Sequence, residues 1–331
     1  QYPCETILSG PAASTMGAAA VTGQAATAVV LDIGGTTTDI SLLLDGQPLY
    51  ASRGARINEN FTHIKAISTR SLPLGGDSPV CYKPDRGIYI DPVRRGPAAC
   101  FGGDNATITD IFNCKYELSV GEAEKSRQSL QRLQAQANLD AAALLEAVEN
   151  MVMVQLLSAM ENIFSEWENE PAYRVWEVVH NRKFEVKRII GIGAAAGAIV
   201  PVLAARMKAD SFIHALAPIA NALGAAVARP TLAFNLHIDT EKGYYFTDHD
   251  GIGGTIRKGA GLQMEDAQKL AGEVMQQLAQ QRGLAEYTGE AEFTREEQFN
   301  MIRGWDRTGK IFELGMQIKP GFIKEFEEGS L

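Results

Sequence analysis

The chain has 331 residues, of which 45% are hydrophobic and 21% are charged, and its net charge is −9. A chain of this size can bury a substantial core, and we expect two packed units. The acidic balance argues against a nucleic-acid partner, which needs a basic face. No apolar stretch approaches the ~18–20 residues that span a bilayer, so a membrane protein is not expected.

The cysteines indicate a reducing compartment. There are four of them, without a CxxC pair and below the density of a secreted disulfide scaffold: Cys4, Cys81, Cys100 and Cys114. No signal peptide is visible, and we expect a cytoplasmic protein without a zinc cluster. The chain begins at Gln1 in what reads as mid-protein sequence, so we expect a fragment of a longer protein.

The first predicted elements are a helix and two strands. The stretch ETILSGPAASTMGAAAVTG predicts a short strand, a break at Ser9–Pro11 and then a helix that ends at Gly23. So many Ala and Gly residues indicate that another backbone packs very close to this helix. Two strands are expected next, at 28–33 and 37–44, and they are hinged on Gly34-Gly35.

The turn between these strands is unusually polar. Eight consecutive residues, Asp32 to Asp39, carry glycines, threonines and carboxylates with almost no apolar side chain. A P-loop or Rossmann glycine loop opens a helix, whereas the β-branched residues after this turn predict a strand. A hairpin with a glycine corner can still bind phosphate through successive backbone amides, and a carboxylate at the strand end can hold Mg²⁺. The alternative is a structural turn that the aspartates cap.

The middle of the chain predicts short strands and then helices. Glycines and prolines punctuate 57–110, and 87–90 is one expected strand. Ser119-Val-Gly-Glu122 predicts a capping box that opens a helix. Asp140 is expected to cap a longer helix to about Trp167 that is buried on most sides. Its apolar positions predict core rather than a cofactor site: Leu144, Leu145, Val148, Met151, Val152, Leu156 and Met160.

A second glycine loop follows a predicted strand at 184–190. It reads Gly191-Ile-Gly193-Ala-Ala-Ala-Gly197 and opens an Ala-rich helix, as in a loop that contacts a nucleotide. A Rossmann site with Asp210 on the ribose is the alternative, but Asp210 follows a helix rather than a strand tip. The later predicted elements are a strand at 211–215, a helix at 218–228, β structure at 231–247, an amphipathic helix at 262–281 and a hairpin at 293–318.

Four stretches together resemble a known family. Asp32-Ile-Gly34-Gly35-Thr36-Thr37-Thr38-Asp39 resembles the second phosphate motif of the actin/Hsp70/sugar-kinase ATPase superfamily, and more narrowly that of the hydantoinase A / 5-oxoprolinase family. The segment just before it, LPLGGDS at 72–78 and GPAACFGGDNATITD at 96–110 are similar to further blocks of that family, in the same order. The resemblance covers about residues 5–230.

The resemblance implies an α/β fold: an actin-like ATPase domain with RNase-H-like topology, a helical insertion and an α+β C-terminal segment. Members of the superfamily clamp ATP between two phosphate hairpins, and only one is expected here. The other hairpin is therefore expected in an N-terminal lobe upstream of this chain. The implied divisions are 1–118 for a lobe with the phosphate hairpin, 119–183 for the insertion, 184–230 for the adenosine-motif part of the same lobe, and 231–331 for the C-terminal segment.

The resemblance also implies a function, the ATP-dependent opening of a five-membered cyclic amide, with ATP and Mg²⁺ as cofactors. Asp32 is expected to hold Mg²⁺ through water or to position the nucleophile, and Asp39 to support the loop. Many family members pair with a second hydantoinase-type subunit. The competing function is an ATP-dependent regulator or reactivating factor, and a sugar-kinase-like phosphotransferase is a third. The expected contacts are Gly34, Gly35, Thr36 and Thr37 for the phosphates, and Gly191, Gly193, Ala194 and Gly197 for adenosine.

The chain departs from the larger family members in its second loop. They carry a GGxGxxH pattern there, whereas this loop has no histidine, which places the chain nearer to a short branch of the family. DGIGGT at 250–255 superficially repeats the phosphate motif, but its spacing is shifted and polar residues flank it. We expect a glycine-rich turn at that point.

Several other residues have two interpretations each. Asp77 follows two glycines and is either a catalytic group for metal or substrate or a solvated turn aspartate. Asp110 either caps a turn or faces the cleft, and Arg94-Arg95 either hold an anionic substrate or lie on a wet loop. Cys100 has no histidine nearby in sequence, so a catalytic thiol is not favoured. The histidines lack metal-ligand spacing, and Trp305 has no assigned role: His63, His180, His214, His237 and His249.

Overall fold

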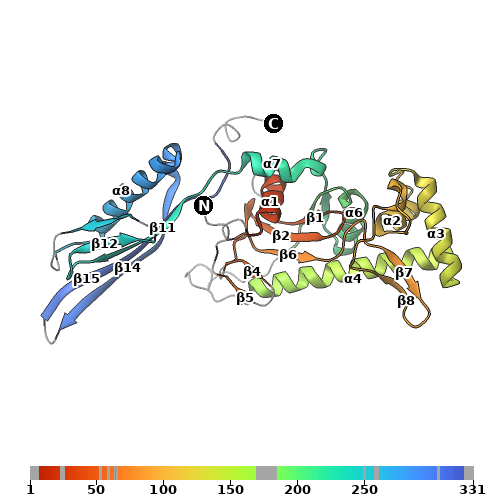
Figure 1. Cartoon of the computed structure of the whole chain (residues 1–331), viewed down its shortest axis with the longest axis horizontal. Coiled ribbons are helices and arrows are strands. Elements are labelled where there is room, and N and C mark those ends of the chain that lie inside the picture. The colour runs from red at the N-terminus through yellow and green to blue at the C-terminus, as the bar shows by residue number, and fades with distance from the viewer. Residues whose placement is uncertain are drawn as a thin grey trace. The chain divides into compact units, whose positions relative to one another are not determined.

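A computed structural model describes residues 7–22, 27–51, 54–57, 60–62, 64, 66–168, 185–248, 251–256, 261–303 and 306–323 (Figure 1). The chain divides into two compact units, Gln1–Val227 and Ala228–Leu331. The second unit begins three residues before the predicted start of the C-terminal segment at 231.

The first unit is built on a sheet of six strands. Its order is β10-β9-β1-β2-β3, and β6 also pairs with β2. β1 to β3 form an antiparallel meander, and β9 and β10 continue the sheet parallel to β1. This is the RNase-H-like order, and it confirms the α/β, actin-like fold. The bounds are β1 (Ala28–Ile33), β2 (Thr38–Leu44), β3 (Gln47–Pro48), β6 (Thr69–Leu72), β9 (Arg188–Ile192) and β10 (Asp210–Phe212).

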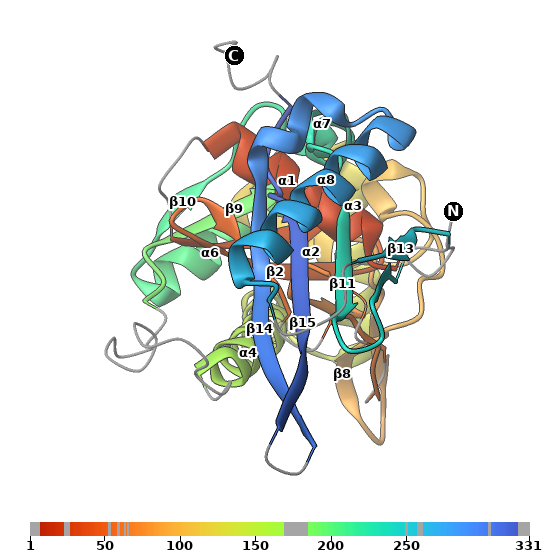
Figure 2. The same cartoon turned by 90° about the vertical axis from the view of Figure 1, so that its left-hand side faces the viewer.

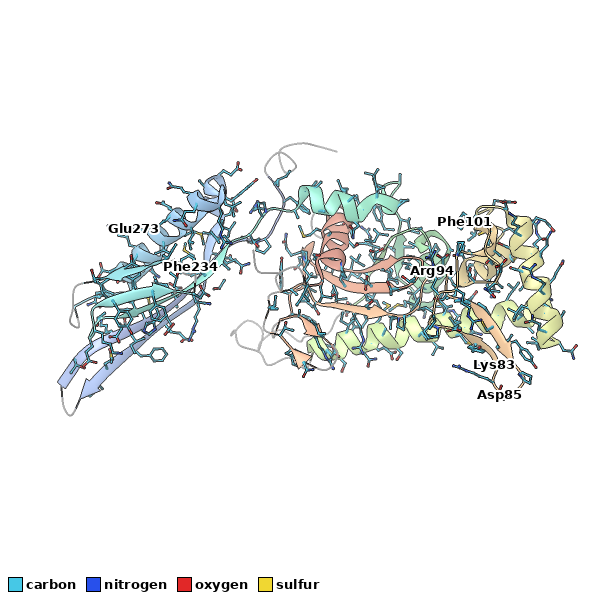
Figure 3. The ribbon with its side chains drawn as sticks, in the orientation of Figure 1. Lys83, Asp85, Arg94, Phe101, Phe234 and Glu273 are labelled. Atoms are coloured by element: carbon cyan, nitrogen blue, oxygen red, sulfur yellow. The ribbon has the colours of Figure 1, made fainter. Side chains whose placement is uncertain are left out.

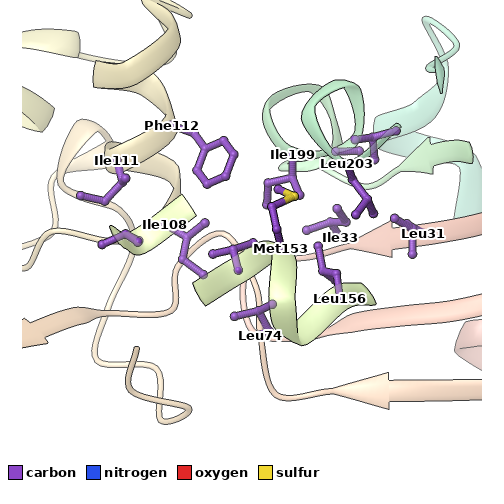
Figure 4. Packing of buried hydrophobic residues seen from close by; sticks show 14 of the residues in the cluster. Leu31, Ile33, Leu74, Ile108, Ile111, Phe112, Met153, Leu156, Ile199 and Leu203 are labelled. Carbon is purple, nitrogen blue, oxygen red and sulfur yellow. The ribbon is translucent and has the colours of Figure 1, made fainter. Parts of the chain in front are cut away.

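Helices cover both faces of this sheet. In Figure 1, α1 (Ser9–Thr22) and α7 (Ala220–Val227) lie on one side of the strands and α4 (Ala141–Glu168) on the other. The face towards α4 is apolar, because alternate residues of β1 and β2 enter one buried cluster with α2 (Ile108–Tyr116), α4 and α6 (Ala196–Met207). Figure 4 shows part of this cluster: Leu31, Ile33, Met153, Leu156, Ile199 and Leu203.

α1 and α7 cross with their backbones in contact. A Cβ added at Gly17 of α1 would lie 1.9 Å from the carbonyl oxygen of Ala220, and one added at Gly224 of α7 would lie 1.9 Å from that of Ala13. Neither position accepts any side chain. The contact confirms the prediction that the small residues of the first helix serve close backbone packing.

The helical region differs from the prediction at one end. Ser119 has φ +55 and Glu122 takes the N-cap position of α3 (Ala123–Ala137) without a side-chain hydrogen bond, so the predicted capping box is wrong. A capping box does form at Thr107 and Asp110, where it opens α2, a helix that the sequence analysis did not predict. Asp140 caps α4 as predicted, since its Oδ1 accepts the Ala143 N–H at 2.8 Å.

The prediction that no segment is long and apolar enough to span a membrane is wrong for the long helix α4. By length and composition α4 passes that test. Its apolar positions nevertheless lie in the core of the first unit, as Leu144, Val148 and Leu156 are fully buried there. The core position explains the apolar composition, and the rest of the predicted insertion, 169–183, lies outside the described residues.

Short elements complete the first unit. Two small hairpins, β4–β5 and β7–β8, stand apart from the main sheet, and the predicted strand at 87–90 is β8. The bounds are β4 (Arg56–Ile57), β5 (Asn60–Phe61), β7 (Val80–Lys83), β8 (Gly87–Ile90), η2 (Ala99–Phe101) and η3 (Ala217–Ile219).

The second unit is an antiparallel sheet with one helix, in the order β13-β12-β11-β15-β14. Figure 2 shows α8 lying across the sheet, and its apolar side packs on Leu236, Phe312 and Leu314. The prediction of a glycine-rich turn at DGIGGT is wrong for its last three residues, because Gly253–Thr255 forms β13 and pairs with β12. Asp250 lies outside the described residues. The bounds are β11 (Ala233–Asp239), β12 (Tyr244–Thr247), β13 (Gly253–Thr255), α8 (Met264–Arg282), η4 (Ala285–Glu290), β14 (Ala291–Arg303) and β15 (Asp306–Ile318).

Candidate functional site

The turn between β1 and β2 presents hydrogen-bond donors to solvent. The Gly34 N–H donates to the Thr37 carbonyl at 3.0 Å and closes the hairpin. Within the described part of the chain, the N–H groups of Gly35, Thr36 and Thr37 have no hydrogen-bond partner. Thr36 and Thr37 are exposed and Gly35 is half-buried, so these donors are accessible. Successive unpartnered N–H groups form a concave site for an anion.

The loop at 74–77 orients the turn. The N–H groups of Gly76 and Asp77 donate to the carbonyls of Gly34 and Gly35 at 2.9 and 2.8 Å. A Cβ at Gly75 would lie 2.5 Å from the Gly35 carbonyl oxygen, so only glycine fits there. Both carbonyls of the glycine pair are therefore occupied by this loop, and the groups left for a ligand at the turn are donors.

Two carboxylates lie at the base of the turn. Asp32 and Asp39 are register partners on β1 and β2. Asp32 Oδ2 accepts the Ser14 hydroxyl of α1 at 2.5 Å, and the Ser14 oxygen accepts an N–H of Asn221 from α7 at 2.9 Å. Burial raises the pKa of Asp39, the hydrogen bond from Ser71 partly offsets this, and the charge of Asp32 raises it further. The two carboxylates therefore interact electrostatically.

The second glycine loop lies against the end of β1. The Ala195 N–H donates to the Ile33 carbonyl at 3.1 Å. Gly193 has φ +84, and a Cβ there would lie 2.6 Å from Asp32 Oδ1, which excludes any side chain. The structure thus brings the two predicted ligand loops together at Asp32, and both Ala194 and Gly197 are exposed.

Gly191 is the exception among the predicted adenosine contacts. It is buried in β9, and a Cβ there would lie 2.8 Å from Val200 Cγ2 of α6. Close packing of helix on strand accounts for this glycine. We therefore correct the assignment of Gly191 as a ligand contact.

Asp77 is not the solvated turn aspartate of its second interpretation, because its side chain is only 16% exposed. Its Oδ2 accepts from Arg94 Nε at 3.0 Å and Nη2 at 2.8 Å, and its Oδ1 accepts the Ala98 N–H at 3.1 Å. Asp77 Oδ2 is also the atom that a Cβ at Gly35 would meet first, at 2.5 Å. Asp77 therefore joins Arg94 to the turn.

Asp110 and Cys100 have structural roles. Asp110 is fully buried and accepts the N–H groups of Ala99, Cys100 and Thr107 at 2.8 to 3.0 Å, so it caps rather than faces a cleft. Cys100 is buried beside it, and burial raises the pKa of its thiol to about 11. The thiol stays protonated near neutral pH, and a nucleophilic cysteine is not supported.

Three of the five histidines, His63, His180 and His249, lie outside the described residues, so the prediction that the histidines form no metal site is not tested for them. Trp305 also lies outside the described residues. His237 pairs with Glu313 at 2.6 Å in the second unit. Among the described residues no cluster of three or more His, Cys, Asp or Glu side chains could hold a metal ion.

A cavity of about 430 Å³ adjoins Asp39, one member of the carboxylate pair. Asp39 and Ser71 line one part of it, and Arg56 and Arg70 line another, where both guanidinium groups contact Glu166 Oε1 at 3.0 Å. No local sequence pattern predicts this cavity, because its walls come from segments that lie up to more than a hundred residues apart in the chain.

One comparison with known proteins shows the family of the chain, and two others show its fold. The family model described as Hydantoinase/oxoprolinase matches residues 1–233. No curated protein matches the chain in sequence. The nucleotide-free structure of acetone carboxylase, from work on ATP-dependent acetone carboxylation, is similar with a TM-score of 0.62 and 15% identity, over 96% of this chain and 50% of that one. The ATP-dependent caprolactamase of Pseudomonas jessenii is similar with a TM-score of 0.51 and 13% identity, over 93% of this chain and 48% of that one. The chain thus spans about half the length of these two structures.

Proposed function

The chain belongs to the hydantoinase/oxoprolinase family, and from that membership we propose that it is the ATP-binding part of an enzyme that opens a five-membered cyclic amide. The observation that carries the proposal is the turn at Gly35–Thr37, whose three N–H groups are unpartnered within the described chain and accessible. A bound triphosphate supplies the oxygens that such donors require.

The phosphates are proposed to lie on Gly34, Gly35, Thr36 and Thr37, with the threonine hydroxyls as further donors. The nucleoside is proposed to lie on the exposed residues of the second loop, Ala194 and Gly197, which the structure holds next to the turn. Small residues at these positions let the flat base and the ribose approach the backbone.

The carboxylate pair fits Mg²⁺. This ion is usually held by one or two carboxylates together with water and substrate phosphates, so a closed protein cage is not needed. Asp32 would hold the ion and Asp39 would lie beside it. A bound Mg²⁺ would neutralise phosphate charge and reduce the repulsion between Asp32 and Asp39 that contributes to the raised pKa of Asp39.

The proposed substrate is an amide, which water hydrolyses very slowly unless the amide is activated. Transfer of the terminal phosphoryl group of ATP to the amide oxygen releases ADP and makes the amide carbon more electrophilic. Water then adds to that carbon, the C–N bond breaks as the nitrogen takes up a proton, and a second water releases phosphate from the acyl phosphate that remains. Asp32 is held by Ser14 and confined by Gly193, and this fixed carboxylate suits the orientation of the attacking water. Asp39 supports the same hairpin through its bond with Ser71.

The proposed clamp needs a second phosphate-binding lobe. The chain spans about half the length of the two similar structures, which is consistent with such a lobe elsewhere in the protein. A second hydantoinase-type subunit is a further proposed partner, and the substrate is proposed to be a small cyclic amide.

ATP hydrolysis by the full-length protein, measured with a panel of five-membered cyclic amides, tests the proposal. We expect one amide to stimulate hydrolysis and Asp32→Ala to lower the stimulated rate at least about 100-fold, a loss of the size seen for groups that position the reacting atoms. Asp45→Ala, in the exposed turn after β2, is the matched control and should keep the parent rate. Equal rates for the parent and Asp32→Ala would remove Asp32 from the mechanism.

A further inference from the structure

Arg94 is held in a fixed position by Asp77, the residue that lies against Gly35 of the phosphate-motif turn. Two of its nitrogens, Nε and Nη2, donate to one oxygen of Asp77 at 3.0 and 2.8 Å. The other oxygen of Asp77 accepts the Ala98 N–H, so the carboxylate is anchored on both sides. The Asp77 side chain is 16% exposed, whereas that of Arg94 is 47% exposed. The carboxylate is therefore enclosed while the guanidinium retains an accessible edge.

The same carboxylate oxygen links Arg94 to the turn. Asp77 Oδ2 lies directly against Gly35, and the Asp77 N–H donates to the Gly35 carbonyl at 2.8 Å. Figure 3 labels Arg94 near the end of the main sheet. Gly35 also begins the run of unpartnered N–H groups. A half-exposed cation thus lies one side chain away from the donors that face a ligand.

Within the described chain, Arg94 Nη1 has no hydrogen-bond partner. A guanidinium offers five N–H donors in a rigid fork, and binding Asp77 through one edge leaves the other edge preorganised for an anion. Charge-assisted bonds from arginine to phosphate are short and about twice as strong as neutral ones. An anion on the turn would therefore meet Arg94 without reordering of its side chain.

The two ligand loops reach the turn from different points. The Gly193–Gly197 loop contacts the end of β1, through Asp32 and Ile33, whereas Arg94 binds Asp77, whose carboxylate lies against Gly35. If the nucleoside lies on the loop, as in the proposed function, the phosphate chain runs from the loop towards the tip. Its last phosphate is then the one nearest to Arg94.

We propose that Arg94 binds the terminal phosphate of the nucleotide and so makes this site selective for triphosphate over diphosphate, with Asp77 as the residue that positions it. The proposal rests on the proposed function, because it uses the nucleotide site at the turn. It gives Arg94 a role in specificity, and it replaces the direct catalytic role that the sequence suggested for Asp77.

The neighbouring arginine provides a matched control. Arg95 pairs with Asp91 and is 48% exposed, which is close to the exposure of Arg94. Among the described residues, the Arg95 guanidinium forms its ion pair with Asp91 and not with the turn or with Asp77. A neutral substitution at Arg95 therefore removes the same charge from the same segment without touching the proposed contact.

The test is the affinity of the full-length protein for ATP and for ADP, each with Mg²⁺, by titration calorimetry. Arg94→Gln should weaken ATP binding about 10- to 100-fold, as expected for loss of bonds to a charged group, and leave ADP binding within about twofold. Arg95→Gln should change neither affinity. Asp77→Asn frees Arg94 but keeps an acceptor for Ala98, so it should lower the ATP to ADP preference by a smaller factor.

The outcomes separate this proposal from the one it rests on. If the parent binds neither nucleotide, the proposed function is refuted and this proposal with it. If the parent binds both and Arg94→Gln keeps the parental ATP to ADP ratio, the role of Arg94 is refuted while nucleotide binding stands. An equal loss of both affinities also refutes the terminal assignment, and thermal unfolding of the variant shows whether a folding defect caused it.

Discussion

The carboxylate pair at the base of the turn makes the stability of the protein depend on pH. Burial and the nearby charge of Asp32 raise the pKa of Asp39 above its ordinary value, despite the hydrogen bond from Ser71. Asp39 therefore keeps its proton in the folded protein at pH values where the unfolded chain has lost it. Its contribution to stability is full below the unfolded pKa and is lost as the pH rises through the folded one.

Replacing Asp39 with asparagine tests this sign. Asp39→Asn removes the ionisation but keeps an oxygen that can accept from Ser71. We expect the variant to be more stable than the parent at pH 7. The difference should shrink as the pH falls through the raised pKa of Asp39 and should disappear below about 3.9, the ordinary value for aspartate. Thermal unfolding across this pH range measures it, with the exposed Asp45→Asn as control. A variant less stable than the parent at pH 7 would contradict the prediction.

At the level of residues, the sequence predicted which residues lie together in the hairpin, but it did not predict their hydrogen-bond and ion-pair partners. Residues within a single hairpin, such as Gly34 to Thr37, lie together because chain connectivity requires it. The partners of Asp32 and Asp77 lie outside the hairpin, since Ser14 is 18 positions from Asp32 and Arg94 is 17 positions from Asp77. Asn221, which holds Ser14, is 207 positions from it. No local pattern encodes these pairings, so the contacts of Asp77 with Arg94 and Ala98 became visible only in the fold.

At the level of elements, the crossing of α1 and α7 determines the position of the side chains that hold Asp32. The Ser14 and Asn221 side chains that reach towards Asp32 come from these two helices. Their spacing depends on Gly17 and Gly224, where the backbones touch. A side chain at either glycine must push the helices apart and disturb the hydrogen bonds to Asp32.

Gly17→Ala should therefore destabilise the protein by about 1–3 kcal/mol, the usual cost of forcing extra atoms into a packed contact. Gly10→Ala in the same helix meets nothing within 4 Å and is the matched control, with no loss expected. Urea unfolding of both variants provides the comparison. If Gly17→Ala proved as stable as Gly10→Ala, the two helices would not be in close contact in solution.

Most elements were predictable because their patterns are long or strongly periodic. The strands at 28–33 and 38–44, the helix α4 and the helix α8 fall within a few residues of their expected bounds. The helix α2 was missed because it has only nine residues and begins inside a segment rich in glycine. The signal was present in Thr107-Ile-Thr-Asp110, a capping box, whereas the similar pattern at Ser119 failed because that residue adopts φ +55.

At the level of the whole molecule, the two units have separate hydrophobic cores. The larger cluster joins the main sheet to α2, α4 and α6, and the smaller one joins α8 to its own sheet. The residues proposed to bind nucleotide all belong to the first unit. A substitution in the second core should therefore lower the stability of the second unit without changing the affinity for nucleotide.

Phe312→Ala tests this separation, because Phe312 is fully buried in the second core. The deletion should destabilise the second unit by about 3–5 kcal/mol, the usual cost of replacing a buried phenylalanine. Hydrogen exchange should then be faster in β11, β15 and α8 but unchanged in β1 and β2, with ATP affinity within about twofold of the parent. Phe299→Ala on β14 of the same sheet removes a ring that is 51% exposed and should change neither measurement. Faster exchange in β1 and β2 of Phe312→Ala would show that the two cores unfold together.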